Sequence, residues 1–281
     1  MKFFLKINLS KENSIPVVEQ VLKMFDEDKH EYMLCCDDWL GEIVTPDRCA
    51  VSTTEGIKWC DVVITIGGDG TLLGVGQAAA DYNKPILGIN TGHLGFLTAI
   101  EGNQIDLLKK IDDGETFTVK HHHFIQAKVN NCGWKYCLND VVISKYIYSN
   151  TVQRQLYSNG NQILNFSGDG VIVASSTGST AYSLSVGGPI VDSDLHAMII
   201  SPVAPHSFNR TSMVLGADKS VTIKVSDRSN NKAYIAFDGA QHQEISEKDE
   251  ITVQVSPKYV SIYTLDKFGQ FEKVDKKLKS R

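Results

Sequence analysis

One short segment restricts the fold of this chain more than any other. Residues 61–66, Asp-Val-Val-Ile-Thr-Ile, form a β-branched run that ends in the turn Gly67-Gly68-Asp69-Gly70-Thr71. Residues 71–82, which follow, are rich in alanine and are predicted to be helical. A continuous apolar strand that passes through a short turn into a helix is typical of a parallel sheet with helical crossovers.

The rest of the first hundred residues repeats this alternation. Strands are predicted over residues 2–8, 32–36 and 85–89, and residues 15–26 have the apolar spacing of a helix. Strands that alternate with helices imply a parallel sheet with right-handed connections. We therefore predict an α/β N-terminal domain, Rossmann-like, over residues 1–115.

The pattern changes from about Phe117. Short alternating runs separated by Asn, Gly, Ser and Asp cover residues 124–129, 134–138, 153–157, 162–166, 171–174, 221–225 and 232–237. Such runs predict a mainly antiparallel all-β C-terminal domain over residues 116–250. Residues 250–264 read as two more strands around Pro257, and the basic tail, residues 273–281, is expected to be solvated.

Charge and composition exclude several classes of protein. A net charge of −5 argues against non-specific binding to nucleic acid or anionic membranes, which need a basic surface. No apolar run is long enough for a signal peptide or a bilayer span, so we expect a cytoplasmic protein. The six cysteines show no C-x-x-C spacing, so reduced thiols are expected and a zinc site is not.

The glycine turn has the properties of a phosphate site. Its glycines let the backbone approach a ligand closely, and the helix that follows offers unpaired N–H groups to a phosphate. A carboxylate at Asp69 would repel a phosphate, so we interpret it as a general base or as a contact to a metal or hydroxyl. The alternative is that Asp69 only caps the helix. The spacing fits neither G-x-x-x-x-G-K-[ST] nor G-x-G-x-x-G.

A second group of small and polar residues lies in the β region. Asn139 and Asp140 follow a predicted hairpin, and residues 167–183 lead from a predicted strand into a loop rich in hydroxyls and glycines. A short helix is predicted to begin near Thr180. This loop could surround a phosphate or a polyhydroxyl ligand, or it could be an ordinary serine-rich loop. No G-x-S-x-G elbow is present, which disfavours acyl transfer.

Taken in order, these segments resemble the NAD kinase family. The resemblance rests on Gly-Gly-Asp-Gly-Thr at 67–71, the segment 88–97, the Asn139-Asp140 pair, Thr-Gly-Ser-Thr-Ala-Tyr-Ser at 177–183 and Gly-Gly-Pro at 187–189. It spans residues 62–239. The glycine turn is shared with diacylglycerol kinases, whereas the 177–183 segment is far more specific.

The resemblance implies an N-terminal α/β domain, a C-terminal β domain and a final stretch, residues 251–281, that returns to the first. It implies transfer of the ATP γ-phosphate to the 2′-hydroxyl of the adenosine ribose of NAD, with Mg²⁺ as the expected metal. Asp69 would be the base. Contacts to the dinucleotide would come from Asp69, Gly70, Asn139, Asp140, Asp169, Thr180, Ala181, Tyr182, Ser183, Leu184, Ser185 and Ala204. Phosphate contacts would come from Gly67, Gly68, Gly70 and Thr71. A homodimer or homotetramer is also implied.

The chain departs from the family pattern at two places. Ser167 and Gly168 stand where many members carry a basic side chain ahead of Asp169. A positive contact to the new phosphate would then come from elsewhere, such as another subunit. The sequence Asp238-Gly239-Ala240-Gln241 has one residue more than the family's Asp-Gly-Gln. Two other functions stay open: a non-catalytic NAD(P)-binding sensor, and a lipid kinase that uses the same glycine turn.

Three consecutive histidines, His121, His122 and His123, invite a metal site. No cysteine, carboxylate or further histidine lies at ligand spacing from them. We therefore predict the start of a strand with imidazoles that face solvent.

Overall fold

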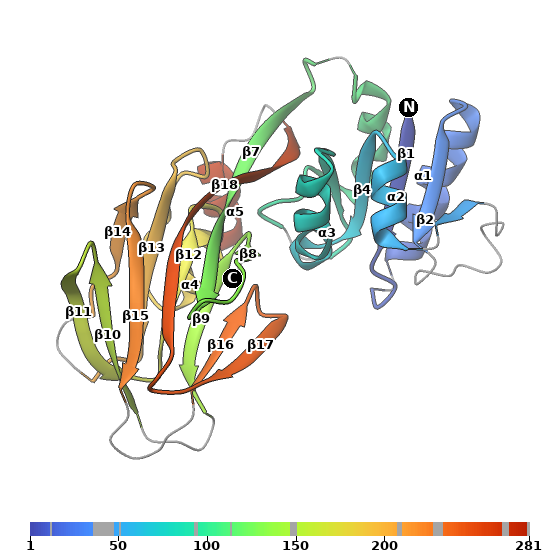
Figure 1. Cartoon of the computed structure of the whole chain (residues 1–281). Helices are drawn as coiled ribbons and strands as arrows, with labels where there is room; N and C mark the ends of the chain where they lie inside the picture. Colours follow the sequence, from blue (N-terminus) through green and yellow to red (C-terminus); the bar gives the residue numbers. More distant parts are fainter. Residues whose placement is uncertain are drawn as a thin grey trace. The chain divides into compact units, whose positions relative to one another are not determined.

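The computed structural model describes residues 1–11, 13–35, 48–50, 52–92, 95–112, 114–146, 151–206, 210–226, 233–265 and 270–279. The chain forms two compact units (Figure 1). The first consists of residues 1–121 and 260–281, and the second of residues 122–259. Strands β7 (Phe117–Val129) and β18 (Glu250–Leu265) each run from one unit into the other. The division therefore falls inside these long strands, after residues 121 and 259, whereas the expected boundaries are 115 and 250.

The first unit is an α/β sheet. In chain order its elements are β1 (Lys2–Ile7), α1 (Ser14–Glu27), β2 (Glu31–Cys35), β3 (Cys49–Ala50), α2 (Thr53–Trp59), β4 (Val62–Gly67), α3 (Asp69–Asp81), β5 (Ile86–Asn90), β6 (Ile100–Glu101), the 3₁₀ helix η3 (Gly102–Lys110) and α5 (Gln270–Lys279). The strand order is β3-β2-β1-β4-β5, and every one of these pairs is parallel. The predicted parallel α/β fold is confirmed, although Cys36 lies outside the described residues.

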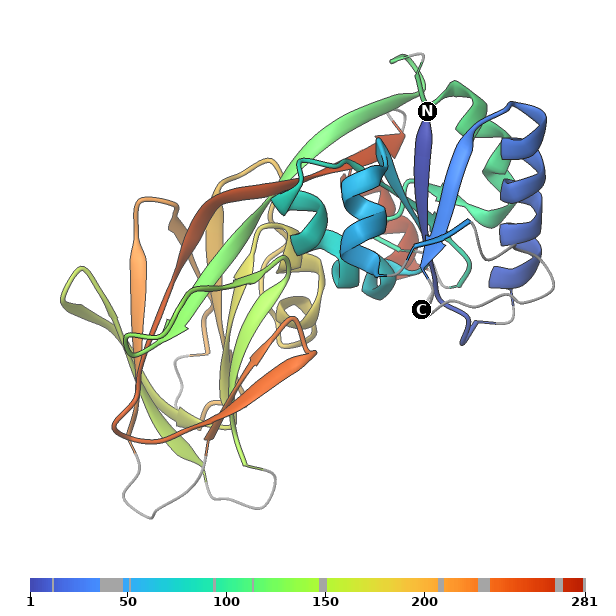
Figure 2. The same ribbon diagram turned by 45° about the vertical axis from the view of Figure 1, so that its right-hand side comes forward.

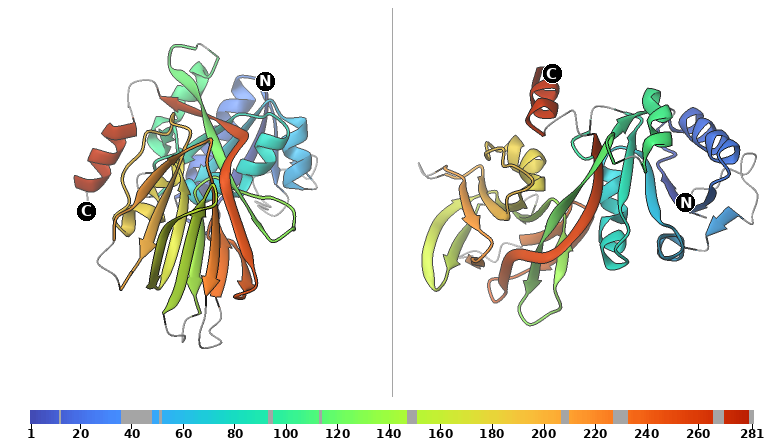
Figure 3. Two further views of the ribbon diagram at one scale, coloured as in Figure 1. Left: turned by 60° about the vertical axis from the view of Figure 1, so that its left-hand side comes forward. Right: turned by 90° about the horizontal axis from the view of Figure 1, so that it is seen from above.

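Alternation along β1 explains how helices cover both faces of this sheet. Phe3, Leu5 and Ile7 pack in one apolar cluster with the buried side of α1 and with η3. Phe4 points to the other face, where a Cβ on Gly56 of α2 would lie 2.1 Å from its ring. Helix α3 also contacts α2, so these two helices share that face (Figure 3).

The second unit is a sandwich of two β layers (Figure 2). One layer has the order β11-β10-β15-β18 and the other the order β14-β13-β12-β9-β16-β17, all antiparallel. The bounds are β8 (Lys135–Cys137), β9 (Asp140–Lys145), β10 (Val152–Ser158), β11 (Asn161–Gly168), β12 (Gly170–Ser175), β13 (Ala197–Val203), β14 (Met213–Gly216), β15 (Ser220–Ser226), β16 (Ala233–Phe237) and β17 (Gln241–Ile245). Apolar side chains from both layers form one core, which confirms the predicted antiparallel β region.

Three local expectations were wrong. Residues 250–264 lie in a single strand, β18, that continues through Pro257; the pairing of β18 with β15 ends at Gln254, before the proline, which has no N–H to donate. The basic tail contains helix α5, whose Val274 is buried. His122 does not face solvent either: it is buried, and its ring forms a 2.9 Å hydrogen bond with the Thr177 hydroxyl.

Among the described residues, no helix is both long enough and apolar enough to cross a membrane.

Candidate active site

The glycine turn lies at the carboxyl end of β4, between the neighbouring strands β1 and β5. Gly67 is the last residue of β4, and Asp69 is the first residue of α3. The N-cap residue of this helix is Gly68, which has no side chain to cap it. The carboxylate of Asp69 instead accepts hydrogen bonds from the backbone N–H groups of Phe96 (2.9 Å) and Leu97 (3.0 Å). The simple capping interpretation of Asp69 is therefore wrong, and the carboxylate holds a second turn beside the first.

The second turn needs glycine at position 95. A Cβ there would lie 2.5 Å from Asp69 Oδ1 and 2.5 Å from Thr98 Oγ1, far inside normal contact. Because Gly95 has no side chain, the backbone of residues 95–97 can close onto the carboxylate. In the sequence, the 88–97 segment was notable only for its resemblance to the family; the contact with Asp69 gives residues 95–97 a physical role. His93 and Leu94 lie outside the described residues.

A lysine from the far end of the chain reaches the same turn. Lys273 of α5 donates a hydrogen bond from Nζ to the carbonyl oxygen of Thr98 (3.0 Å). Burial lowers the pKa of its ammonium, while the nearby carboxylates of Asp69 and Glu101 act in the opposite direction. Lys273 was not predicted from the sequence, because a run of basic residues gives no signal that one of them is partly buried against a distant turn.

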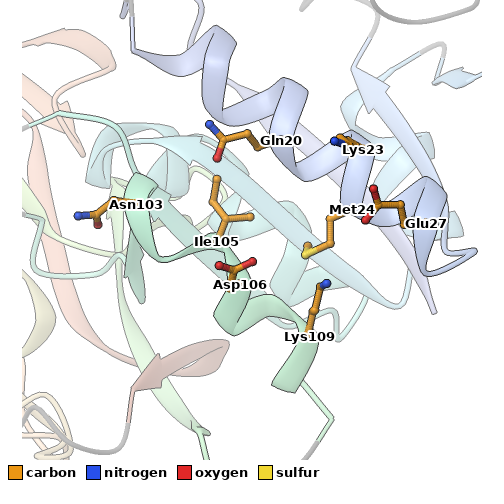
Figure 4. A pocket seen from close by; sticks show the side chains of 8 residues that line it. All are labelled: Gln20, Lys23, Met24, Glu27, Asn103, Ile105, Asp106 and Lys109. Atoms are coloured by element: carbon orange, nitrogen blue, oxygen red, sulfur yellow. The ribbon is translucent and has the colours of Figure 1, made fainter.

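Described residues of the first unit line two hollows that bear on a ligand site. One, of about 410 Å³, is lined by residues of the loop after β1 and of the first turns of α3, including Asn8, Gly70 and Thr71. The other, of about 250 Å³, lies between α1 and η3 (Figure 4). Its lining pairs Lys23 and Lys109 with Glu27 and Asp106, so it favours neither sign of charge. The first hollow borders the glycine turn and is the one relevant to a phosphate ligand.

In the second unit, one aspartate fixes the Asn139-Asp140 pair. The carboxylate of Asp238 accepts hydrogen bonds from the backbone N–H groups of Leu138 (2.8 Å), Asn139 (2.8 Å) and Asp140 (3.0 Å). Asp238 itself has φ +47° in the tight β16–β17 connection. The segment 238–241 differs from the family's Asp-Gly-Gln by one residue, and within it the carboxylate of Asp238 supports the backbone of residues 138–140.

The loop at 177–180 packs directly on that pair. The N–H of Ser175 donates to the carbonyl oxygen of Asn139 (2.8 Å), and the N–H of Gly178 donates to the Ser175 hydroxyl (2.9 Å). A Cβ on Gly178 would lie 2.0 Å from the carbonyl oxygen of Asn139. The two sequence motifs are thus adjacent because position 178 carries no side chain.

The expected dinucleotide contacts that follow differ in exposure. A 3₁₀ turn covers Thr177–Thr180 and a short helix, α4, covers Tyr182–Ser185, so the helix begins two residues later than predicted. Tyr182 is 46% exposed, as a ring available to stack on a ligand must be. Ser183 is buried and its hydroxyl is hydrogen-bonded to that of Ser201 (2.9 Å), so it supports the loop. Thr180, Ala181 and Leu184 are half-buried, and Ser185 is exposed.

Asp169 and Ala204 form a separate group at the other end of β12. The N–H of Asp169 donates to the carbonyl oxygen of Val203 (3.0 Å). Ala204 has φ +44°, and its carbonyl oxygen would lie 3.0 Å from a Cβ on Gly168. In β12, Ala174 pairs with Asp140. At ~3.3 Å per residue, the five positions from Asp169 to Ala174 span about 17 Å.

Basic side chains do reach Asp169, although Ser167 and Gly168, the two residues directly ahead of it in sequence, are not basic. The ammonium of Lys145 lies 2.9 Å from its Oδ1. Below it, the fully buried guanidinium of Arg154 donates to the carbonyl oxygens of Val152, Gly168 and Asp169 at 2.7–2.9 Å. These contacts were invisible in the sequence because they come from two other strands.

The carboxyl of Asp140 is buried and faces a like charge. Burial, together with Asp238, raises the pKa of Asp140 from 3.8 to about 7. Because the pKa of Asp140 is higher in the folded than in the unfolded state, protonation of Asp140 stabilises the fold. This stabilisation is fully present below about pH 4 and is lost as the pH rises toward 7. At about 1.4 kcal/mol per pKa unit, the loss is on the order of 4 kcal/mol.

We expect Asp140→Asn to remove this pH dependence. Between pH 4 and 7.5, the free energy of unfolding of the variant should rise relative to that of the original protein by up to about 4 kcal/mol. Urea denaturation at several pH values measures the difference. Asp249→Asn is the matched control, because Asp249 is only half-buried and its pKa is lowered by hydrogen bonds that its carboxylate accepts from Ser246. Parallel pH profiles for Asp140→Asn and the original protein would contradict the prediction.

Comparison with known proteins agrees with this arrangement. Residues 7–115 match the model of the ATP-NAD kinase N-terminal domain, and residues 138–265 match that of the ATP-NAD kinase C-terminal domain. The chain is 32% identical to an NAD kinase of a Thermoanaerobacter species, over 98% of this chain and 97% of the relative. It is 33% identical to an NAD kinase of Caldicellulosiruptor bescii, over 97% of both chains.

Two solved structures share the fold. Yeast NADH kinase complexed with NADH aligns with a TM-score of 0.84 at 19% identity, covering 99% of this chain and 87% of that one. An NAD kinase from Archaeoglobus fulgidus in complex with ATP aligns with a TM-score of 0.75 at 22% identity, covering 100% of both chains.

Proposed function

The chain belongs to the NAD kinase family, and we propose that its phosphoryl transfer takes place at the carboxylate of Asp69. Its activity is that of an NAD kinase: the γ-phosphate of ATP passes to the 2′-hydroxyl of the adenosine ribose of NAD, giving NADP and ADP. The observation that carries the assignment of the site is the pair of backbone hydrogen bonds that fixes Asp69 at the end of β4.

The geometry suits a general base. Each oxygen of Asp69 accepts one backbone N–H and keeps further lone-pair capacity for a hydroxyl proton. Phosphoryl transfer depends on positioning and charge neutralisation more than on covalent chemistry. A carboxylate held by two N–H groups cannot rotate away, so its position relative to the glycine turn is set before the ribose hydroxyl arrives.

The second unit supplies the residues that we propose for the dinucleotide. Asn139 and Asp140 would bind ribose hydroxyls or the adenine, and Tyr182 would stack on a base. Asp169 and Ala204 would contact the nicotinamide side. Asp169 and Ala204 lie about 17 Å along β12 from Asp140. We therefore propose that, in a homo-oligomer, Asp169 and Ala204 of one subunit complete the site that Asn139 and Asp140 of another subunit begin. The cytoplasmic location expected from the sequence remains a prediction.

Mg²⁺ is proposed to arrive with ATP. Among the described residues, no three His, Cys, Asp or Glu side chains converge as a metal cage. Mg²⁺ usually keeps several waters and takes one or two carboxylates together with substrate phosphates. Asp69 beside a phosphate site fits that mode, and the ion would neutralise charge on the transferred group.

The test is direct. The purified full chain, incubated with NAD, ATP and Mg²⁺, should produce NADP, measured with an NADP-specific dehydrogenase. The same preparation with diacylglycerol in place of NAD should show no lipid phosphorylation. Calorimetric binding of NAD without any NADP formation would instead assign the chain a sensor role and would refute the proposed function.

A further inference from the structure

The ammonium group of Lys11 lies over the glycine turn, although Lys11 belongs to none of the motifs that resemble the NAD kinase family. Lys11 belongs to the loop between β1 and α1. Its Nζ lies 3.0 Å from the position that a Cβ on Gly68 would occupy, and 2.3 Å from the corresponding position on Gly92. Gly68 follows β4 and Gly92 follows β5, so one lysine spans the ends of two neighbouring strands.

The loop that carries Lys11 is fixed by hydrogen bonds. The side chain of Asn8 accepts from the backbone N–H of Ser10 (3.1 Å), and the N–H of Ser14 donates to the carbonyl oxygen of Lys11 (2.9 Å). The buried hydroxyl of Ser14 is hydrogen-bonded to that of Thr91 (2.9 Å). This last contact ties the loop to the residue before Gly92, so the position of the lysine stem follows from the fold.

The two glycines leave room for the ammonium. A Cβ at Gly92 would lie 2.3 Å from Nζ and 3.2 Å from Cε, so the ammonium would have to move from its position over the two glycines. The side chain of Asn90 exchanges hydrogen bonds with the backbone of Gly92, at 3.2 Å to its N–H and 3.4 Å to its carbonyl oxygen. The absence of a side chain at Gly92, and the hydrogen bonds of Asn90 to the backbone of Gly92, therefore keep the position of the ammonium free of other atoms.

In the part of the chain that the structure describes, the Lys11 ammonium forms no hydrogen bond or ion pair. It is half-buried and lies next to Gly68, the residue before Asp69. An ammonium offers three donors and no acceptor. Held over a glycine turn with those donors unused, it is suited to a ligand that carries several anionic oxygens.

We propose that Lys11 binds the polyphosphate chain of the phosphate donor. The proposal rests on the proposed function and adds a donor-site residue to it. The hollow of about 410 Å³ is lined by the same loop, at Asn8 and Leu9, and by Gly70 and Thr71 of the turn. Lys11 does not itself line this hollow, so a nucleoside triphosphate would extend from the hollow across the glycine turn to bring its phosphates to Lys11. The lysine would then neutralise charge that the Asp69 carboxylate alone would repel.

The experiment compares Lys11→Met with Lys23→Met. Lys23 is an exposed lysine on α1 that lines the other hollow. Loss of a charge-assisted hydrogen bond is expected to raise KM for ATP by about 10- to 100-fold, with KM for NAD changed less than about threefold. Lys11→Arg should recover most of the ATP affinity, because it keeps the charge. Lys23→Met should leave both KM values unchanged.

Gly92→Ala provides a second, independent route to the same defect. Its Cβ would displace the ammonium while Lys11 remains in the sequence, so KM for ATP should rise as it does in Lys11→Met. Thermal unfolding of each variant checks that it is folded. An active protein whose Lys11→Met variant keeps the original KM for ATP would overturn the proposal for Lys11 alone. A rise confined to KM for NAD would also overturn it. Absence of NADP formation by the unmodified chain would refute the proposed function instead.

Discussion

Asp69→Asn is expected to lower kcat for NADP formation by about 10²–10⁴-fold, the range that a positioned general base contributes. The amide cannot take the proton of the ribose hydroxyl. It also has only one acceptor oxygen for the two N–H groups of Phe96 and Leu97 that the carboxylate now satisfies. Steady-state kinetics with saturating ATP and NAD measure the loss.

The two consequences of Asp69→Asn can be separated. Leaving one N–H without an acceptor costs about 1–3 kcal/mol, which a domain with an ordinary stability of about 5–15 kcal/mol tolerates at 25 °C. The variant should therefore unfold at a lower temperature and yet be folded during the assay. Asp81→Asn, at the exposed end of the same helix, should retain full activity. If Asp69→Asn keeps more than a tenth of the original kcat, Asp69 only fixes the 95–97 turn.

The strand, the glycine turn and the helix around Asp69 were predictable because each depends on residues close together in sequence. A β-branched run, three glycines and an alanine-rich segment determine β4, the turn and α3 with little help from elsewhere. The hydrogen bonds to Phe96 and Leu97 were not predictable, because they join positions 27 and 28 residues apart. Any residue except proline can donate a backbone hydrogen bond, so such donors cannot be recognised from residue type. Gly95 alone in this turn indicates that the backbone comes close to Asp69.

The supporting residues escaped prediction for a similar reason. Asp238 holds the Asn139-Asp140 backbone across 98 to 100 positions of sequence, and Lys273 reaches Thr98 across 175. Pattern analysis detects periodicity within one element. It does not detect a side chain whose partner is a backbone group on a distant strand. The antiparallel layers were predictable from alternation, whereas the residues that fix the site between strand ends required the structure.

Gly178→Ala is expected to be nearly as damaging to dinucleotide binding as Asp69→Asn is to catalysis. The added Cβ would lie 2.0 Å from the carbonyl oxygen, 2.5 Å from the carbonyl carbon and 2.7 Å from the Cα of Asn139. All three atoms are backbone, and Asn139 is held from the other side by Asp238. Neither the Asn139 segment nor the 177–180 loop can move away without breaking hydrogen bonds. Overpacking of this kind costs about 1–3 kcal/mol.

The strain from Gly178→Ala would be relieved by moving the 177–180 loop away from Asn139, and that movement separates the two motifs proposed to bind NAD. We therefore expect KM for NAD to rise by more than about tenfold, with KM for ATP nearly unchanged, since an error of about 1 Å in a binding site can cost about 10²-fold. Gly133→Ala is the matched control: it adds the same methyl group to the same unit, and apart from its chain neighbours no described residue has an atom within 4 Å of its Cβ. Equal KM values for NAD in the two variants would show that the contact between Gly178 and Asn139 has no part in recognition of the dinucleotide.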